Sequence, residues 1–338
     1  LLAATPSLAM LMVTPFIPRL IAQAGMRRFL LLCIVADLIL FLTLPLLDHL
    51  AAWFVIRFLM GATVAGLFVA GETWINEIAD ESSRGRTMGI YAMVVAGGFA
   101  LGPLLLPATG IEGWTPFVVG SVIVGLAALP LLWGRAQSPH FPADPTFTLV
   151  RFFGVAPTLC AAVLLAAFKD AAGMPLIPVY AVREGLSHDA AALMLTVLGV
   201  GAVSMQVPIG WLADRVNRHG LLIICAAGGA LGAASLPLVI HAGWILWVVL
   251  FLWGGVFAGV YTTSLVILGQ RFRGAALATG NAAFGFFWGV GGLTGPAVAG
   301  AAMDLWDPHG LPATLCAASV LFVLLALARR LTFFRADG

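Results

Sequence analysis

Long apolar runs recur from one end of the chain to the other, and they constrain its fold more than any other feature. Residues 30–47, LLLCIVADLILFLTLPLL, include a single charged residue, Asp37. A helix of about 20 residues, at about 1.5 Å per residue, crosses the roughly 30 Å of hydrocarbon in a bilayer. Backbone groups in lipid must be satisfied internally, and the runs lack the two-residue alternation of barrel strands. The sequence therefore predicts an all-α polytopic membrane protein.

Eleven spans are predicted, and they leave no room for a separate soluble domain. The 338 residues are 61% hydrophobic and 9% charged, whereas soluble proteins average about 45–50% apolar and 25% charged. The predicted spans are residues 1–22, 29–47, 52–77, 87–108, 114–133, 152–180, 189–212, 220–241, 244–270, 275–303 and 311–328.

The basic residues predict the orientation, because positive charge is retained on the cytoplasmic side. Thirteen of the 17 Lys and Arg residues fall on one side of the predicted spans, together with the C-terminus. A single Lys among the basic residues indicates a high-GC bacterial genome. We therefore expect a multi-pass protein of the bacterial inner (plasma) membrane with a cytoplasmic C-terminus. Its expected partners are the lipid bilayer and a small-molecule solute, with no nucleic acid and a monomeric state.

A charged loop between two apolar runs recurs in weaker form. The loop GWLADRVNRHG, residues 210–220, aligns with PRLIAQAGMRR, residues 18–28, at an offset of about 192 residues. The earlier copy has Ala22 where the later one has Asp214. Two further pairs keep nearly the same offset: MGATVAG at 60–66 with WGGVFAG at 253–259, and GFALGP at 98–103 with GGLTGP at 291–296.

This repeat predicts two six-helix bundles, of which the first shows five helices. We expect the missing helix to precede residue 1, so that 11 of 12 transmembrane helices are present in an N-terminally truncated chain. The expected N-terminal bundle is residues 1–133 (helices 2–6), and the Pro-rich tract at residues 134–151 is the expected cytoplasmic linker. The expected C-terminal bundle is residues 152–338 (helices 7–12) with a short cytoplasmic tail.

These motifs resemble those of the major facilitator superfamily. GWLADRVNR resembles its G-x-x-x-D-R-x-G-R loop motif, with Asn217 in place of the second glycine. RFLMGATVAG, residues 57–66, resembles its fourth-helix motif, and GGFALGP, residues 97–103, is similar to its fifth-helix motif, although Leu104 to Leu106 replace glycines found in drug antiporters. RFLMGATVAGLFVAGETWINE and MPLIPVYAVREGLS further resemble the YcaD-like bacterial branch. The resemblance implies two pseudo-symmetric bundles that open a central site to each side in turn.

The function that this resemblance implies is secondary active transport of a small organic solute by rocker-switch alternating access. Proton coupling and efflux are the favoured form, with the proton as coupling ion and no cofactor. The alternative is an uncoupled facilitator, a uniporter of a small metabolite. No Walker loop is present, and all six His residues lie in loops or at span ends, so an enzyme or a metal site is not expected.

A cytoplasmic gate is expected around the charged loops. Asp214 is expected at the N-terminal end of the helix that starts near Arg86 and Thr87, while Arg215 and Arg218 seek acids or helix C-termini. Arg27 and Arg28 are expected to use Glu77 or Asp80. The alternative is a positively charged turn that only sets topology. The candidate gate residues are Arg27, Arg28, Glu77, Gly210, Asp214, Arg215 and Arg218.

Ionisable residues within spans are functional candidates, because a charge at the span centre costs about 2.5 to 3.5 kcal/mol on insertion scales. Arg57 and Glu72 lie on one face of a predicted helix. Arg57 is expected to contact the substrate and Glu72 to carry a proton. The alternative is that both residues form fixed ion pairs. Aromatic residues recur every four positions at Trp253, Phe257 and Tyr261. They are expected either to line a cavity or to pack between helices. The candidate substrate and proton pathway is Arg57, Glu72, Gln206, Trp253, Phe257, Tyr261, Asn281 and Trp288.

Two further groups are expected to act structurally. Asp37 is expected to pair with Arg57, and Lys169 with Asp170 to form a mutual pair or an outer gate in the outer third of its span. Small residues spaced by four let helices approach closely, and prolines bend them. The candidate packing and bending residues are Gly61, Gly98, Gly102, Pro103, Gly291, Gly295 and Pro296.

Overall fold

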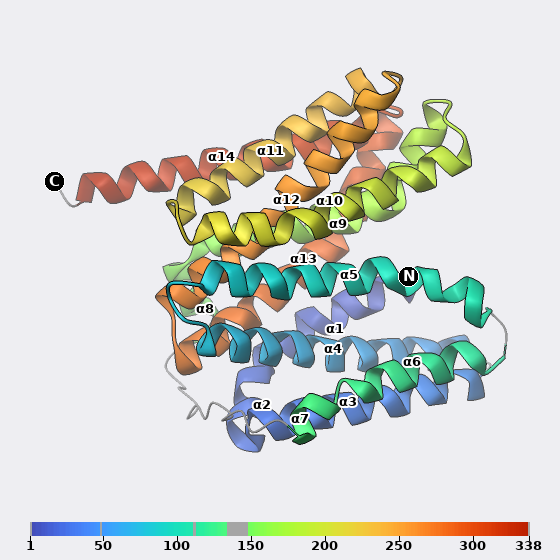
Figure 1. The fold of residues 1–338 in the computed structure, drawn as a ribbon, viewed down its shortest axis with the longest axis vertical. Helices are drawn as coiled ribbons and strands as arrows, with labels where there is room; N and C mark the ends of the chain where they lie inside the picture. Colours follow the sequence, from blue (N-terminus) through green and yellow to red (C-terminus); the bar gives the residue numbers. More distant parts are fainter. Residues whose placement is uncertain (1, 48, 111–112, 134–147, 337–338) are drawn as a thin grey trace. The chain divides into compact units, whose positions relative to one another are not determined.

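A computed structural model shows an all-helical chain (Figure 1). It describes all residues except 1, 48, 111–112, 134–147 and 337–338. Every regular element in this described part is a helix: η1 (Leu2–Ala4), α1 (Thr5–Val13), η2 (Thr14–Phe16), α2 (Ile17–Ala24), α3 (Met26–Thr43), η3 (Leu44–Leu46), α4 (Leu50–Ile78), α5 (Arg84–Thr109), α6 (Thr115–Leu126), α7 (Leu129–Trp133), α8 (Leu149–Val155), α9 (Pro157–Arg183), α10 (His188–Ala213), α11 (Arg218–Val239), α12 (Trp244–Arg271), α13 (Gly274–Leu305) and α14 (Gly310–Ala336). The predicted all-α polytopic fold is confirmed.

Within the described residues, ten helical segments are long and apolar enough to cross a membrane. They are Thr5–Ala24, Met26–Leu46, Leu50–Ile78, Thr115–Trp133, Pro157–Arg183, His188–Ala213, Arg218–Val239, Trp244–Arg271, Gly274–Leu305 and Gly310–Arg329. The 26-residue helix α5 lies outside this set, so the count of eleven spans remains a prediction. Most of the linker predicted at 134–151 falls outside the described residues.

Corresponding helices follow one another in the same order in the two sequence repeats. Helix α3 begins at Met26 and α11 at Arg218, while α5 begins at Arg84 and α13 at Gly274. These paired starts lie about 190 residues apart, close to the offset read from the sequence. The repeated motifs therefore occupy equivalent places in the order of helices.

The chain divides into two compact units that do not coincide with the sequence repeats. Unit 1 comprises residues 1–78, 101–155 and 271–290, and unit 2 comprises the rest of the chain, residues 79–100, 156–270 and 291–338. Helices α5 and α13 are therefore each divided between units. Each unit contains residues of both repeats, and the predicted bundle limits remain a prediction.

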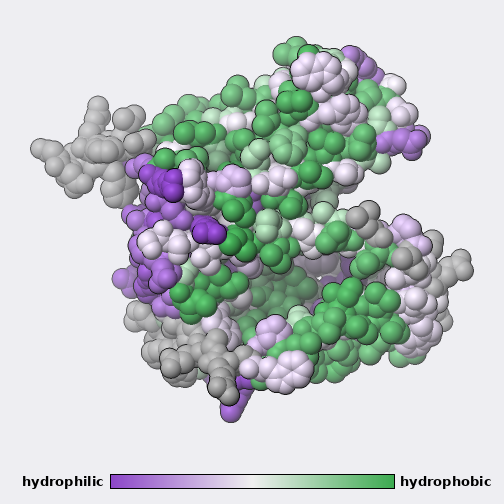
Figure 2. All heavy atoms as spheres, viewed as in Figure 1, coloured by the Kyte–Doolittle hydropathy of each residue, from purple (hydrophilic) through white to green (hydrophobic). Residues whose placement is uncertain are grey.

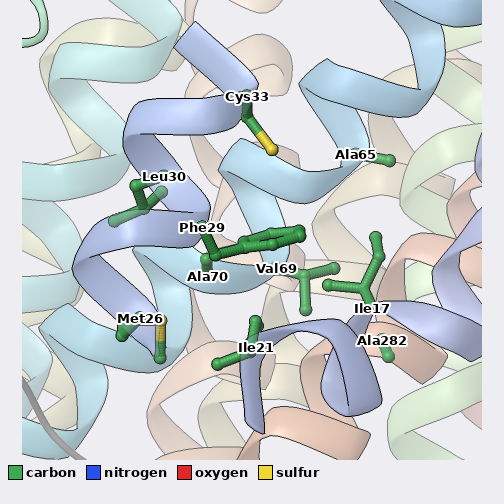
Figure 3. Close-up of a cluster of buried hydrophobic side chains, with 10 residues drawn as sticks. All are labelled: Ile17, Ile21, Met26, Phe29, Leu30, Cys33, Ala65, Val69, Ala70 and Ala282. Carbon is green, nitrogen blue, oxygen red and sulfur yellow. The ribbon is translucent and has the colours of Figure 1, made fainter. Parts of the chain in front are cut away.

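The core of unit 1 lies between α2, α3 and α4, with one contribution from α13. Figure 3 shows the Phe29 ring of α3 extending toward Val69 of α4. Ala65 and Ala70 are small enough to let these helices approach, and both are fully buried. The remaining members of this core are Ile17, Ile21, Met26, Leu30, Cys33 and Ala282. Burial of these residues fixes α3 and α4 side by side.

Glycines set the closest helix crossing in the core of unit 2. An added Cβ on Gly201 of α10 would lie 2.0 Å from the Phe251 carbonyl oxygen of α12. An added Cβ on Gly254 of α12 would lie 2.2 Å from the Leu198 carbonyl oxygen of α10. Both faces of this crossing therefore require glycine, as in other close helix pairs within membranes.

The glycines predicted to serve packing fall into two groups. A Cβ on Gly61 would lie 2.6 Å from Pro6, and Cβ atoms on Gly291 and Gly295 would lie 2.6 and 2.5 Å from atoms of α9. Close packing is present at these three positions. Gly98 and Gly102 differ, because an added Cβ would meet no described atom within 4 Å. The predicted close packing is wrong there, since the α5 surface at these glycines faces open space. Pro103 lies inside α5 and Pro296 inside α13.

The outer surface is apolar, as expected for helices that face lipid. Figure 2 shows apolar side chains over much of the visible face. Leu238 and Leu305 are among the most exposed large apolar side chains of the described residues. Lipid-facing leucines need no polar partners, so this surface fits a bilayer and not water.

The α10–α12 crossing gives a prediction about stability. Gly201→Ala places a methyl group against backbone and should destabilise the protein by about 1 to 3 kcal/mol, the range for an overpacked core. Gly199→Ala, on the same helix, is the control because its Cβ meets nothing within 4 Å. Thermal unfolding of the purified protein in detergent measures both. Equal unfolding temperatures for the two variants would contradict the crossing.

Candidate functional site

Helices α5 and α10 cross closely in unit 2. An added Cβ on Gly85 would lie 2.2 Å from the Gly210 carbonyl oxygen, and one on Gly89 would lie 2.6 Å from the Gln206 carbonyl oxygen. A side chain at either glycine would push the helices apart, because packed interiors have no spare volume. The crossing therefore brings the first turn of α5 beside the last turn of α10 and the loop that follows.

Asp214, the residue that ends α10, holds its carboxylate at the N-terminus of α5. Asp214 Oδ1 accepts a hydrogen bond from Gly85 N–H at 2.6 Å, and Oδ2 accepts one from Arg86 N–H at 2.9 Å. First-turn N–H groups lack intrahelical partners and carry the positive end of the helix dipole, so a carboxylate satisfies them. The contact expected from the loop motif is present, and it joins the second repeat to the first.

Glu81, in the loop between α4 and α5, binds two arginines. Arg218 Nη1 donates to Glu81 Oε1 at 2.7 Å, and Arg84 Nε donates to Glu81 Oε2 at 3.2 Å. Arg218 Nε also donates to the Ala213 carbonyl at the C-terminus of α10, 3.1 Å away. Burial raises the pKa of the Glu81 carboxyl, but hydrogen bonds and charge from Arg218 and Arg84 outweigh it and hold the pKa below the usual 4.5. The carboxylate is therefore ionised at neutral pH.

Glu81 and Arg84 belong to this cluster, but the sequence-based prediction of the gate did not include them. Arg84 is fully buried and donates through Nη2 to the Ala79 carbonyl at 2.9 Å. The available signal was the run DESSRGR, residues 80–86, which carries as dense a set of charges as the loop at 210–220. A charged run directly after an apolar span therefore also predicts a loop whose charged side chains bind helix ends and other charged residues.

Two residues of the α10–α11 loop have other partners than expected. The guanidinium carbon of Arg215 lies 3.7 Å from the centroid of the Trp211 ring, so this residue stacks on an aromatic face and not on an acid. Asn217 precedes α11, and its Oδ1 accepts from Gly220 N–H at 2.9 Å. Asparagine in place of the glycine of the family motif is explained by this N-cap.

Unit 1 has a matching carboxylate at the N-terminus of α13, but it comes from a different place. Glu77 Oε2, near the end of α4, accepts a hydrogen bond from Gly274 N–H at 3.0 Å. This bond occupies the position that the missing aspartate at Ala22 would be expected to serve. Arg27 Nη2 donates instead to the Leu132 carbonyl at 2.8 Å. The predicted pairing of Arg27 with Glu77 is wrong, because Arg27 binds the Leu132 carbonyl and Glu77 binds the start of α13. The pairings with Asp80 remain predictions.

A buried polar group joins α4 and α13 within unit 1. Asn281 Nδ2 donates to Thr73 Oγ1 at 3.0 Å, and both residues are buried. Glu72, the neighbour of Thr73, is 2% exposed, and Asn76 is fully buried one turn further along α4. Asn281 Oδ1 is buried without a hydrogen-bond partner in the described chain. The structure therefore brings Asn281 close to the helix segment that carries Glu72.

The expected pair of Asp37 with Arg57 is absent from the described residues. Asp37 is 4% exposed and accepts a hydrogen bond from Thr63 Oγ1 at 2.9 Å. Arg57 is partly buried on α4 and has no ion pair in the described chain. The prediction is wrong because Asp37 accepts its hydrogen bond from Thr63, which is also on α4. Trp288 of α13 is partly buried in the same unit.

The remaining pathway candidates lie in unit 2. Gln206 of α10 is buried and accepts a hydrogen bond from Thr262 Oγ1 of α12. Trp253 and Phe257 of α12 are 3% and 2% exposed, and Tyr261 is partly exposed one turn further along. The pathway candidates are thus divided, with Arg57, Glu72, Asn281 and Trp288 in unit 1 and Gln206, Trp253, Phe257 and Tyr261 in unit 2.

Lys169 lies deeper in its helix than the sequence suggested. The chain breaks at Ala156, whose backbone is non-helical, and α9 begins at Pro157 and ends at Arg183. Lys169 is therefore near the middle of a 27-residue helix, and its prediction in the outer third is wrong. Its ammonium lies 3.5 Å from Asp170 and 4.8 Å from the centroid of Phe257. The predicted mutual pair is present.

Repeated membrane-length helices, carboxylates at the starts of α5 and α13, and buried polar groups within spans define the class of multi-span solute transporters. The chain belongs to the Major Facilitator Superfamily, whose sequence model matches residues 1–296 and 159–336. Members of this family are transporters and not enzymes, so the chain moves a solute across a membrane.

Curated relatives and solved structures agree with this family. The chain is 26% identical over 276 residues to the uncharacterized MFS-type transporter YfkF of Bacillus subtilis (strain 168), covering 78% of this chain and 69% of YfkF. It is 24% identical over 285 residues to the uncharacterized MFS-type transporter YcaD of Escherichia coli O7:K1 (strain IAI39 / ExPEC), covering 82% of this chain and 72% of YcaD.

Two solved structures share the fold. The human organic anion transporter MFSD10 (TETRAN) has a TM-score of 0.79 at 17% identity, covering 96% of this chain and 82% of MFSD10. The E. coli fucose:proton symporter FucP has a TM-score of 0.75 at 16% identity, covering 96% of this chain and 90% of FucP. The resemblance to the YcaD-like branch is thus confirmed among the curated relatives, and the structures show the fold.

The Asp214 contact gives a second prediction. Asp214→Asn removes the charge from two hydrogen bonds at the start of α5 and should lower the free energy of unfolding by about 1 to 3 kcal/mol. Asp304→Asn, an exposed aspartate, is the matched control. Thermal unfolding at neutral pH measures both variants. Equal stability of the two would show that the α5 contact contributes nothing.

The Glu81 cluster gives a prediction about pH. Because the pKa of Glu81 is lower in the folded protein than its usual 4.5, its stabilising contribution is complete above pH 4.5 and disappears as the pH falls through the folded value. Glu81→Gln should therefore be less stable than the wild type at neutral pH, and the difference should shrink in acid below pH 4.5. Unfolding temperatures across this range measure it. A constant difference at every pH would contradict the Glu81 contacts.

Proposed function

We propose that the chain is a proton-coupled secondary active transporter of a small organic solute that works by rocker-switch alternating access. Its expected setting is the bacterial inner membrane, with a cytoplasmic C-terminus, a monomeric state and efflux as the favoured direction. The membrane potential supplies about 2.3 kcal/mol per charge per 100 mV, which is enough to drive such transport without a bound cofactor.

The contacts at helix starts support alternating access. Asp214 bonds the start of α5, and Glu77 bonds the start of α13. Each contact joins a residue of one sequence repeat to a residue of the other, with more than a hundred residues of chain between them. Movement of one repeat against the other must therefore break both contacts. Carboxylate to N–H bonds at loop positions can break and re-form, because water replaces either partner.

The burial of Glu72 is the observation that supports the proposed proton coupling. A carboxyl group that is 2% exposed on a membrane-length helix is costly to keep charged, so proton binding there responds to its surroundings. We propose that Glu72 carries the coupling proton and that its exposure differs between the two conformations. This difference between two states is what coupling of a proton to solute movement requires.

The solute is inferred from residues of this chain and not from the relatives. FucP is named as a symporter of fucose with a proton, and MFSD10 as a transporter of organic anions. The same fold therefore serves solutes of different charge, and the site decides between them. The proposed solute contacts within spans are Arg57 and Trp288 in unit 1, and Gln206, Trp253, Phe257 and Tyr261 in unit 2.

Substitution of Glu72 tests the proposal. Inverted membrane vesicles that contain the protein are given a proton gradient, and the accumulation of each solute in a panel of organic acids, amines and sugars is measured. Glu72→Gln should abolish gradient-driven accumulation while solute exchange without a gradient continues. Asp37→Asn is the control, because Asp37 is a buried carboxyl group with a fixed partner, Thr63; it should keep accumulation.

Three results would contradict the proposal. Unchanged accumulation by Glu72→Gln would remove Glu72 from the proton pathway. Movement of solute by the wild type only down its own gradient would identify a uniporter. No movement of any solute in the panel by the wild type would contradict the proposed transport of organic acids, amines and sugars.

A further inference from the structure

Lys169 is a basic residue near the middle of a membrane-length helix, and its carboxylate partner in the described chain is the adjacent residue, Asp170. Helix α9 runs from Pro157 to Arg183, and Lys169 is only 14% exposed at its side chain. A charged side chain near the middle of a membrane span is costly, so such a residue is found where partners or a function require it. The question is therefore which groups surround the ammonium.

Two aromatic rings lie under the ammonium. Lys169 Nζ is 4.8 Å from the centroid of Phe257 and 5.8 Å from that of Trp253, both on α12. These distances are within the range of cation–π attraction, which fixes the position of the cation but leaves its charge in place. The rings hold Lys169 without neutralising it.

Glycines of α11 hold the two rings rigidly. An added Cβ on Gly229 would lie 2.2 Å from Phe257 Cδ2, and one on Gly232 would lie 2.2 Å from Trp253 Cδ1. The rings therefore sit directly on the α11 backbone, and a close-packed ring cannot change rotamer without displacing a helix. Binding groups that are preorganised in this way lose little entropy when a ligand arrives.

The acid beside Lys169 is a weak partner. Asp170 lies 3.5 Å away, but it is the adjacent residue on the same helix and its side chain is 50% exposed. Adjacent residues of a helix do not face each other, so this pair lacks the geometry of a close ion pair. Trp253 Nε1 is buried, and no group in the described chain accepts its hydrogen. A basic group and an N–H donor without a partner in the described chain therefore lie close together, and a group that carries negative charge and accepts hydrogen bonds would satisfy both.

We propose that Lys169, with Trp253 and Phe257, forms a recognition site for an organic anion, a carboxylate or sulfonate attached to an aromatic body. Tyr261 follows Phe257 by one turn on the same face of α12 and is partly exposed, so aromatic surface continues beside the cation. The inference rests on the proposed transport of an organic solute and names the chemical class of that solute.

Binding to the purified full chain in detergent tests this site. Four ligands share one ring system: 2-naphthoate, 2-naphthalenesulfonate, the neutral 2-naphthamide and the cationic 2-naphthylmethylammonium. A ligand that binds the folded protein raises its unfolding temperature with ligand concentration. Either or both anions should stabilise the protein, and the amide and the amine should not. Stabilisation by the amide or amine equal to that by the anions would overturn the site, as would no stabilisation by either anion.

Three variants separate an anion site from a structural ion pair. Lys169→Gln should weaken anion binding by about 10- to 100-fold, the effect of losing one charge-assisted hydrogen bond, and Lys169→Arg should retain most of it. Asp170→Asn removes a competing carboxylate and should leave anion binding unchanged or tighter. A structural pair predicts instead that Lys169→Gln and Asp170→Asn are equally damaging. That outcome would overturn the proposal even if Lys169→Gln folds poorly, because Asp170→Asn and Lys169→Arg are judged independently.

The outcome for this site is distinguishable from the outcome for the proposed function. Anion binding that depends on Lys169, without gradient-driven movement of any solute, keeps the site and removes the transport mechanism. Gradient-driven movement of a neutral or cationic solute, without anion binding, keeps the transport mechanism and removes the site.

Discussion

The contact between α5 and α10 depends on how the unpaired N–H groups at the start of α5 are satisfied. The first N–H groups of α5 have no partner within the helix, and in a protein with so few polar groups the replacement must come from a specific side chain. Asp214 provides it through both carboxylate oxygens. The crossing of Gly85 and Gly210 makes this possible, because any side chain there would move α5 out of reach. Backbone packing and charge therefore determine one contact together.

The polar contacts at helix starts lie within compact units that each contain residues of both sequence repeats. Asp214 and Arg218, from the second repeat, bind residues of the α4–α5 loop and of α5. Glu77, from the first repeat, binds the start of α13. The beginning of each of these helices lies in the same unit as the carboxylate that binds it. Cohesion in this chain thus follows polar contacts at helix starts as well as order in the sequence.

Much of the fold and part of the candidate site could be predicted from the sequence. Apolar runs fix the helices, and the loop motif correctly indicates the partner of Asp214. The Glu77 bond to Gly274 could not be predicted, because it depends on where a helix begins 197 positions further along the chain. Lys169 was assigned the wrong depth because the apolar run hides the break at Ala156. Side-chain partners such as Thr63 for Asp37 depend on helix rotation, which hydrophobic periodicity does not define on helices that are apolar all round.

Helix α4 carries both Glu72 and Glu77, and this has a mechanical consequence. Five residues of helix separate the two acids by about 7.5 Å along the axis and about 140° around it. A continuous helix transmits twist and tilt with little internal bending unless a kink interrupts it. A rotation of α4 about its axis would therefore move Glu72 and Glu77 together, so that a change at the buried acid also reaches the bond between Glu77 and the start of α13.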